Sequence, residues 1–141
     1  MERAVNKLEL ACRNAEKHFM DPVAKKYELS KAELEVLLFL SENPDYNTAR
    51  DIVEYCGLVK SHVSLAVSGL EEKGLLERFY YDGNHRSIHL EISEDAGALV
   101  AELTAAKNAY GDALKGGLTE DEAEQFIALC EKITNTVKKI T

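Results

Sequence analysis

The chain has 141 residues and is 45% hydrophobic, which is enough to build the core of one domain. No apolar stretch approaches the roughly 20 residues of a membrane-spanning helix, and the charged N-terminus is unlike a signal peptide, so we expect a cytoplasmic protein without membrane association. The net charge of −8 argues against indiscriminate nucleic-acid binding, and residues 91–141 carry most of the acidity, with 10 acidic and 5 basic side chains.

The N-terminal segment is predicted to form one amphipathic helix. Its apolar residues recur at steps of three and four, which is typical of a helix with one face against other helices. These residues are Val5, Leu8, Cys12, Ala15 and Phe19. The chain has three cysteines, Cys12, Cys56 and Cys130. This is an odd number, and they lie too far apart in sequence to match the spacing of metal ligands. We expect all three to be reduced and buried, although a redox-sensing Cys12 remains an alternative.

Three later helices begin with a capping box, in which a hydroxyl and a carboxylate three residues apart satisfy free amide groups. The boxes pair Ser30 with Glu33, Thr48 with Asp51, and Thr119 with Glu122. The first predicts a helix from Ser30 to Glu42 that stops before Pro44, and the second a short helix from Thr48 to about Tyr55 that ends at Gly57. After a tight turn, a third helix reaches Lys73. Two short helices joined in this way indicate a helix-turn-helix.

A β-hairpin follows directly. Apolar and polar residues alternate on both sides of Asp82-Gly83-Asn84, which is a strong turn signal. Ile88, Leu90 and Ile92 are predicted to share one face of the second strand. A hairpin after a helix-turn-helix is a wing, so we predict a winged helix-turn-helix, mainly α with a small β-hairpin.

Two amphipathic helices complete the chain. Ser93 opens one that ends near Gly116-Gly117, and the last begins at Thr119. The apolar positions of the last helix are Ala123, Phe126, Cys130, Ile133, Val137 and Ile140. Because the winged region lies between this helix and the N-terminal one, we expect both to form a dimer interface, with intrachain packing as the alternative.

The third helix of the winged region carries the candidate DNA-reading face. Val63, Ala66, Val67 and Leu70 form its core side, which leaves small hydroxyls on the opposite side instead of long charged side chains. Small side chains let a helix approach a major groove closely. The candidate reading residues are Lys60, Ser61, His62, Ser64, Leu65 and Ser68. A merely polar surface is the alternative.

One set of residues in the winged region and just after it forms a familiar pattern: Leu70, Glu71, Lys73, Gly74, Leu75, Arg78, Asn84, His85, Arg86, Ile92, Ser93 and Gly97. With these residues, the stretch from Leu29 to Gly97 resembles the MarR family of bacterial regulators. The family's wing-tip aspartate is Asn84 here, and Asp82 lies close enough to substitute for it. The resemblance implies a homodimer that binds double-stranded DNA, reads a pseudo-palindromic operator, and represses transcription until a small-molecule effector or thiol modification releases it.

The resemblance also implies a division of the chain. We expect residues 1–28 to form an N-terminal dimerisation helix, residues 29–92 the winged DNA-binding region, and residues 93–141 a linker and dimerisation helices. Candidate DNA-binding residues are Thr48, Lys60, Ser61, His62, Ser64, Leu65, Ser68, Arg78, His85 and Arg86. Candidate dimerisation residues are Val5, Leu8, Cys12, Phe126, Cys130, Ile133 and Val137. An effector would contact Arg13, His18 or Tyr27, without a spacing that selects among them.

Other functions are less well supported. A winged helix can also serve as a protein-interaction module, and the acidic balance keeps this alternative open. No phosphate loop, nucleophile motif or catalytic carboxylate pair is recognisable, so we expect no enzyme activity and no cofactor. His85 and His89 are four apart on a predicted strand and should share a face, but two histidines without a third ligand make a poor metal site. Arg86 has its own alternative, an ion pair with Asp82.

Overall fold

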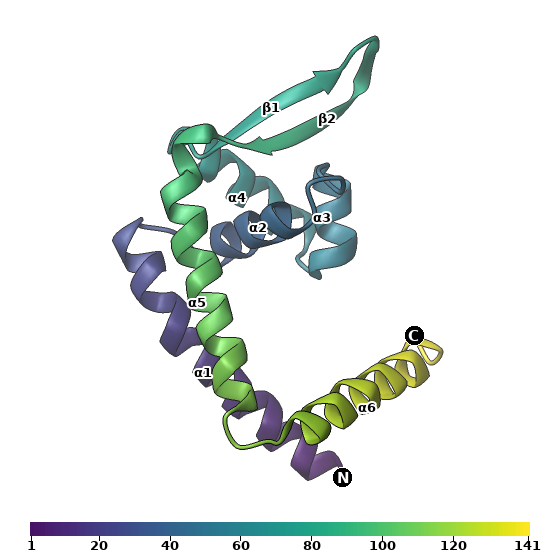
Figure 1. The fold of residues 1–141 in the computed structure, drawn as a ribbon. Coiled ribbons are helices and arrows are strands. Elements are labelled where there is room, and N and C mark those ends of the chain that lie inside the picture. The colour runs from purple at the N-terminus through teal and green to yellow at the C-terminus, as the bar shows by residue number, and fades with distance from the viewer.

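The computed structural model describes residues 1–141 and is mainly helical, with one two-stranded antiparallel sheet (Figure 1). In chain order, the elements are α1 (Glu2–Lys26), α2 (Lys31–Glu42), α3 (Ala49–Cys56), α4 (Lys60–Glu72), β1 (Leu76–Tyr81), β2 (Asn84–Ile92), a 3-10 turn η1 (Glu94–Ala96), α5 (Gly97–Lys115) and α6 (Glu120–Lys138). This is the predicted winged helix-turn-helix between flanking helices. No helix is long and apolar enough to cross a membrane.

All three predicted capping boxes are confirmed. The side chains of Ser30, Thr48 and Thr119 each accept a hydrogen bond from the third backbone amide of their helix, and the carboxylate at that position accepts one in return. Gly57 ends α3 with φ of 73°, a left-handed conformation that glycine adopts without steric cost. By contrast, the Ser93 side chain makes no capping bond, and a 3-10 turn separates it from α5.

The core lies where α2, α4 and α5 meet the base of the hairpin. Helix α2 contacts α3, α4 and α5, and α4 contacts the first strand of the wing. The largest fully buried side chains are Val36, Leu37, Ile52, Val63, Leu70, Leu99 and Leu103. The predicted core side of α4 is confirmed, because Val63, Ala66, Val67 and Leu70 are all buried. These contacts hold α4 in place and leave its other side to solvent.

A buried ion pair ties the start of α2 to the end of α4. Glu33 is only 6% exposed, and both of its carboxylate oxygens accept hydrogen bonds from Lys73 Nζ, at 2.9 and 3.0 Å. Lys73 also donates to the backbone oxygen of Glu28 at 2.6 Å. Gly69 makes room for this carboxylate, because a Cβ there would lie 2.6 Å from Glu33 Oε2. The Lys73-Gly74 segment therefore orients α4 as well as ending it.

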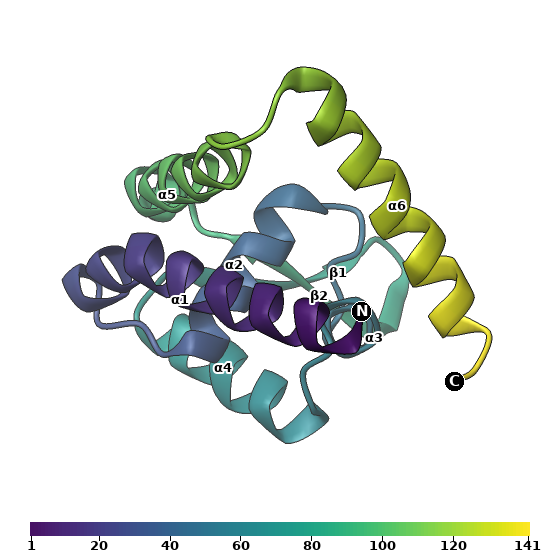
Figure 2. The same ribbon diagram turned by 90° about the horizontal axis from the view of Figure 1, so that it is seen from below.

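Helices α1 and α5 pack side by side, whereas α6 forms a separate arm that runs below the winged region (Figures 1 and 2). Tyr27, just after α1, donates a hydrogen bond to Glu102 on α5, and Lys26 pairs with the same carboxylate at 2.7 Å. The bond to Glu102 raises the pKa of Tyr27. Helix α6 buries no side chain at all.

Within the single chain, none of the three cysteines is fully buried as predicted. Cys130 is exposed because α6 does not pack onto the rest of its own chain, and Cys12 and Cys56 are only partly buried. All three thiols are free. Burial raises the pKa of Cys56, and the nearby carboxylates of Glu35 and Glu42 add to the effect.

Candidate nucleic-acid interface

The outward face of α4 presents short side chains around one large apolar residue. Lys60, Ser61, His62, Ser64, Leu65 and Ser68 are all exposed, as predicted from the sequence. Leu65 is 73% exposed although it lies in the middle of the helix. Packing against the core occupies only the opposite side of α4, so this face is free to contact another molecule.

Some positively charged side chains near this face are already paired with a carboxylate, and others are not. Arg78 on β1 donates from Nε to Glu71 Oε1 at 2.7 Å, so its guanidinium is already paired. Lys60 and Arg86 take part in no ion pair. Lys60 therefore provides a free positive charge at the first turn of α4, where the helix also presents its unbonded amide groups, and Arg86 provides another near the tip of the wing.

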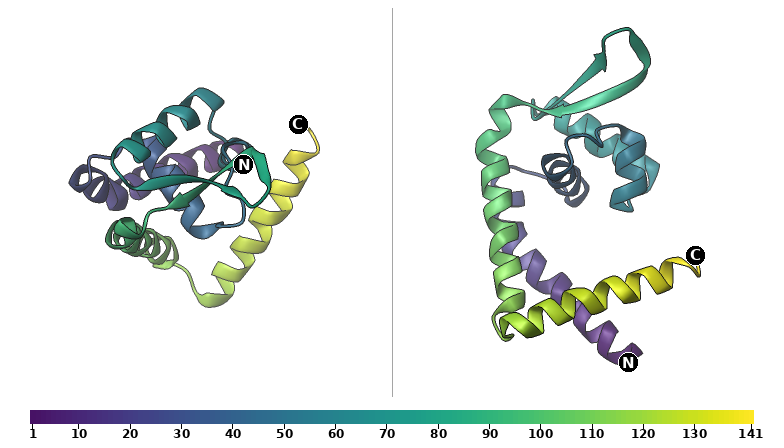
Figure 3. Two further views of the ribbon diagram at one scale, coloured as in Figure 1. Left: turned by 90° about the horizontal axis from the view of Figure 1, so that it is seen from above. Right: turned by 45° about the vertical axis from the view of Figure 1, so that its right-hand side comes forward.

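The wing projects beyond the helices (Figures 1 and 3). Arg86 is the third residue of β2 and therefore lies close to the hairpin turn. Residues 80–88 are all exposed. Asn84 Oδ1 accepts a hydrogen bond from the backbone amide of Arg86 at 3.0 Å, so this asparagine itself braces the tip. The alternative pair between Arg86 and Asp82 does not form. The guanidinium is consequently available to a ligand.

The strand register corrects one prediction about the wing. Pairing is regular from Leu76 opposite Ile92 to Phe79 opposite His89, but then shifts so that Tyr81 faces Asn84. Because of this bulge, the regular alternation of side chains between the two faces of the hairpin does not continue along β2. His85 stacks with Tyr80, whereas His89 stacks with Tyr81, the next residue along β1. Neighbouring strand residues point to opposite faces, so the two histidines do not share a face.

Thr48 and its neighbour connect the helix-turn-helix to the wing. The Thr48 hydroxyl accepts the capping bond from Asp51, and Thr48 also forms an isolated antiparallel bridge with His89. Asn47, which sequence reasoning missed, is 6% exposed and accepts a hydrogen bond from the backbone amide of Leu90 at 2.8 Å. The only signal that the sequence offers for Asn47 is its place beside a capping residue, which gives no hint of a contact with Leu90, 43 residues away.

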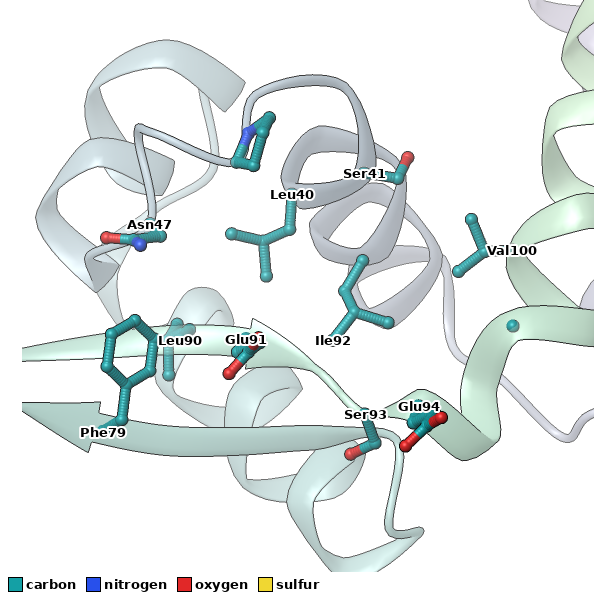
Figure 4. Close-up of a pocket in the computed structure, with 12 residues that line it drawn as sticks. Leu40, Ser41, Asn47, Phe79, Leu90, Glu91, Ile92, Ser93, Glu94 and Val100 are labelled. Atoms are coloured by element: carbon teal, nitrogen blue, oxygen red, sulfur yellow. The ribbon is translucent and has the colours of Figure 1, made fainter.

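A cavity of about 580 Å³ lies beneath the wing, between α2, the base of the hairpin and the start of α5 (Figure 4). Asn47 and Phe79 lie at one side of it and Val100 at the other. Leu40, Leu90 and Ile92 provide apolar wall, whereas Ser93 Oγ is buried without a hydrogen-bond partner. Leu76 and Leu90 pack the base of the wing into the core, and the cavity lies beside this packed region.

A second cavity, of about 950 Å³, lies between α1, the start of α2 and Tyr110 on α5. Arg13 lines it, together with Cys12, Met20 and Leu34, whereas His18 and Tyr27 are not part of its wall. Among the three residues considered for an effector site, only Arg13 is at this cavity. Burial raises the pKa of Tyr110, and a hydrogen bond with Cys12 contributes further.

The candidate dimerisation residues are mostly uncovered in the single chain. Phe126, Ile133 and Val137 are 43–51% exposed, as are Val5 and Leu8 near the other terminus. Cys130 is exposed on α6, and Cys12 is partly buried beside Tyr110. The intrachain alternative thus fails for α6, whereas α1 uses part of its surface to contact α5.

Comparison with known proteins gives one family and many similar structures. Residues 27–83 match the model of the MarR family. A MarR transcriptional regulator from Methanosarcina mazei Go1 is 14% identical with a TM-score of 0.82, over 100% of this chain and 94% of that one. A MarR-family regulator from Listeria monocytogenes, solved with a 26mer DNA, is 17% identical with a TM-score of 0.81, over 94% and 87%.

A third similar structure is BpsR of Bordetella bronchiseptica, whose DNA binding is regulated by 6-hydroxynicotinic acid. It is 19% identical to this chain with a TM-score of 0.72, over 93% of this chain and 98% of BpsR. The likeness extends through the flanking helices as well as the winged region. The predicted fold is therefore confirmed over nearly the whole chain.

Proposed function

We propose that this chain, whose residues 27–83 match the model of the MarR family, is a ligand-responsive repressor that binds a pseudo-palindromic operator in duplex DNA as a homodimer. The observation that carries the proposal is the outward face of α4. Its exposed serines surround Leu65 beside a wing whose arginine is unpaired. Serines can bond to base edges or phosphates, and an aliphatic side chain can contact a thymine methyl.

Binding as a dimer follows from the same proposal. A helix in the major groove reads only a few base pairs, and two half-sites must lie about 34–36 Å apart to face the same side of the duplex. The terminal segments 1–28 and 93–141 would set this separation. The exposed apolar residues of α6 support this assignment, because they lack a partner within the chain.

The cavity between α1, α2 and Tyr110 is the proposed effector site. A ligand there would touch both α1 and the first turn of α2, so it would change how the winged region sits on the terminal helices. Its volume of about 950 Å³ falls within the usual range for small-molecule sites. Acidic and basic side chains alternate around its wall, so the charge of the effector is left open.

The decisive experiment is to select bound fragments from random duplex DNA at moderate salt. We expect an inverted repeat whose half-sites are one helical turn apart, from which an operator is taken for affinity measurements. If no sequence is enriched, and binding vanishes at physiological salt, specific DNA binding is excluded and the protein-interaction alternative gains support.

A substitution on α4 tests which helix reads the operator. Ser64→Glu places a carboxylate against a groove bordered by phosphates, so we expect operator binding to be lost. Thr104→Glu is the matched control, because it adds the same charge at an exposed position of α5. Both variants should keep the parent's circular dichroism. Unchanged operator affinity in the Ser64 variant would remove α4 from the groove.

A further inference from the structure

Asn47 is the most heavily bonded polar residue between the helix-turn-helix and the wing. Its side-chain Oδ1 lies 2.6 Å from Nδ1 of His89, and its Nδ2 donates to the hydroxyl of Tyr81 at 3.3 Å. Since an amide oxygen only accepts hydrogen bonds, His89 Nδ1 carries the proton in this pair. The backbone oxygen of Asn47 accepts the amide of Leu90. One buried residue therefore binds both strands of the wing.

The position of these bonds along the hairpin is informative. His89 faces Phe79 in the last regular pair before the bulge, and its ring also lies 4.1 Å from the ring of Tyr81. Beyond this pair, residues 80–88 are all exposed. The contacts of Asn47 with His89 and Tyr81 are thus the last attachment of the hairpin to the helix-turn-helix before the tip that carries Arg86.

Stability alone does not account for a buried amide at this place. An apolar side chain of similar size would fill the same space without having to replace the hydrogen bonds that Asn47 forms with water in the unfolded chain. Hydrogen bonds are directional and therefore fix the orientation of the groups that they join, which apolar contacts do not. Leu76 and Leu90 are packed in the core at the base of the wing, but a cavity lies behind the hairpin beside them, so the bonds of Asn47 add directional contacts where packing is interrupted.

We propose that Asn47 and His89 are positioning residues for DNA binding, which hold the wing at the angle that brings Arg86 to the DNA while α4 occupies the major groove. This rests on the proposed function. An arginine at a wing tip can enter the adjacent minor groove, where narrow A·T-rich DNA concentrates negative potential. The reach of that guanidinium depends on the direction of a two-stranded arm that is fastened only at its base.

A double-mutant cycle on the selected operator tests the proposal. Asn47→Leu removes both side-chain bonds while keeping a similar volume, and Arg86→Ala removes the cation. Each single variant should flatten the logarithmic salt dependence of affinity by about one unit per lost contact, thus about two per dimer. In the Asn47→Leu background, Arg86→Ala should cause no further change. Losses that simply add, or an unchanged slope in Asn47→Leu, would overturn the proposal.

Two more variants separate positioning from stability. Asn43→Ala removes an amide that bonds only within α2, to the backbone oxygen of Phe39 at 3.1 Å, so it should lower the melting temperature without changing the salt slope. His89→Phe keeps an aromatic ring but removes the bond to Asn47. It should reproduce the slope of Asn47→Leu, and it replaces that variant if Asn47→Leu does not fold.

These measurements distinguish a failure of the proposed function from a failure of the positioning role. If the parent shows no specific binding, the proposed function itself fails. If the parent binds but Arg86→Ala has the parent's slope, the wing does not touch DNA, and the positioning role is wrong although DNA binding stands. If Arg86→Ala flattens the slope but His89→Phe does not, the wing contacts DNA without needing this attachment.

Discussion

The helices of the winged region and α6 are all amphipathic, but the apolar faces in the winged region are buried, whereas that of α6 is exposed. In the winged region, Leu37, Ile52 and Leu70 are completely buried among neighbouring helices. In α6, apolar residues recur with the same helical spacing but remain about half exposed, and no side chain is buried. Periodicity thus reports that a face needs a partner, whereas tertiary contacts decide whether the same chain provides it. A set of exposed apolar side chains this large on one helix points to a second molecule.

The largest expected effect comes from changing the apolar face of α6. Ile133→Asp with Val137→Asp would bury two carboxylates in the proposed dimer interface, so we expect monomers or insoluble protein. Light scattering measures the mass directly. Ala128→Asp with Asn135→Asp is the matched control, since it adds the same charge to the opposite side of α6.

The control should remain a dimer. A well-folded dimer with both substitutions at Ile133 and Val137 would place the interface elsewhere, and the difference between α6 and the winged region would then need another explanation. Dissociation of both double variants would instead show that added charge alone is responsible.

A smaller effect is expected from a substitution inside the winged region. Lys73→Met leaves the buried carboxylate of Glu33 without its cation. Removal of one partner of a buried pair costs roughly 3–5 kcal/mol, and the side chain of Lys73 is about one-third exposed, so we expect about 2–3 kcal/mol here. Urea denaturation at fixed protein concentration measures the loss. Lys107→Met is the control, because its partner Glu42 is half exposed, and it should change little.

The same pair predicts how stability depends on pH. Burial by itself raises the pKa of Glu33, but hydrogen bonds from Ser30 and Lys73 outweigh it and hold the pKa below its ordinary value of 4.5. A carboxyl whose pKa is lower in the folded state stabilises the fold above its unfolded pKa, and this contribution is lost as the pH falls through the folded value. The parent should therefore lose stability below about pH 4.5, and Lys73→Met should lose less over that range. Parallel acid profiles for the two proteins would contradict the assignment.

The smallest expected effect is on thiol reactivity. Cys130 is exposed in the single chain but would be covered in the dimer, so maleimide should label it slowly in the parent and rapidly in the Ile133 and Val137 double variant. Both measurements need the other two cysteines replaced by serine. Rapid labelling of Cys130 in a parent that is dimeric by light scattering would place this part of α6 outside the interface.

Local signals in the sequence predicted most of the fold. The capping boxes located three helix starts, and the change from helical to alternating apolar spacing located the wing, because both patterns arise from neighbours along the chain. The core side of α4 followed from the same spacing. The bulge in β2 was missed, since nothing near His85 marks the extra residues, and the shared face predicted for His85 and His89 was wrong for that reason.

The candidate site was predictable in part. The exposed face of α4 was identified correctly, because a helix with one buried side leaves a defined other side. Asn47 was missed because its partners, His89 and Tyr81, are 42 and 34 residues away. Spacing also did not reveal that α6, with Cys130, stays uncovered within its own chain. DNA contacts and the dimer interface remain predictions.

Helix α5 connects the wing to α6, so a tilt at one end of this helix displaces the other end. At 1.5 Å per residue its 19 residues span about 28 Å, comparable to the separation of two DNA half-sites. A tilt of about 10° at the α6 end would sweep the wing end through about 5 Å, which is close to half the width of a major groove. A small displacement near Tyr110, beside the larger cavity, would thereby be amplified at the wing, so the proposed effector would need to deform the protein only slightly where it binds.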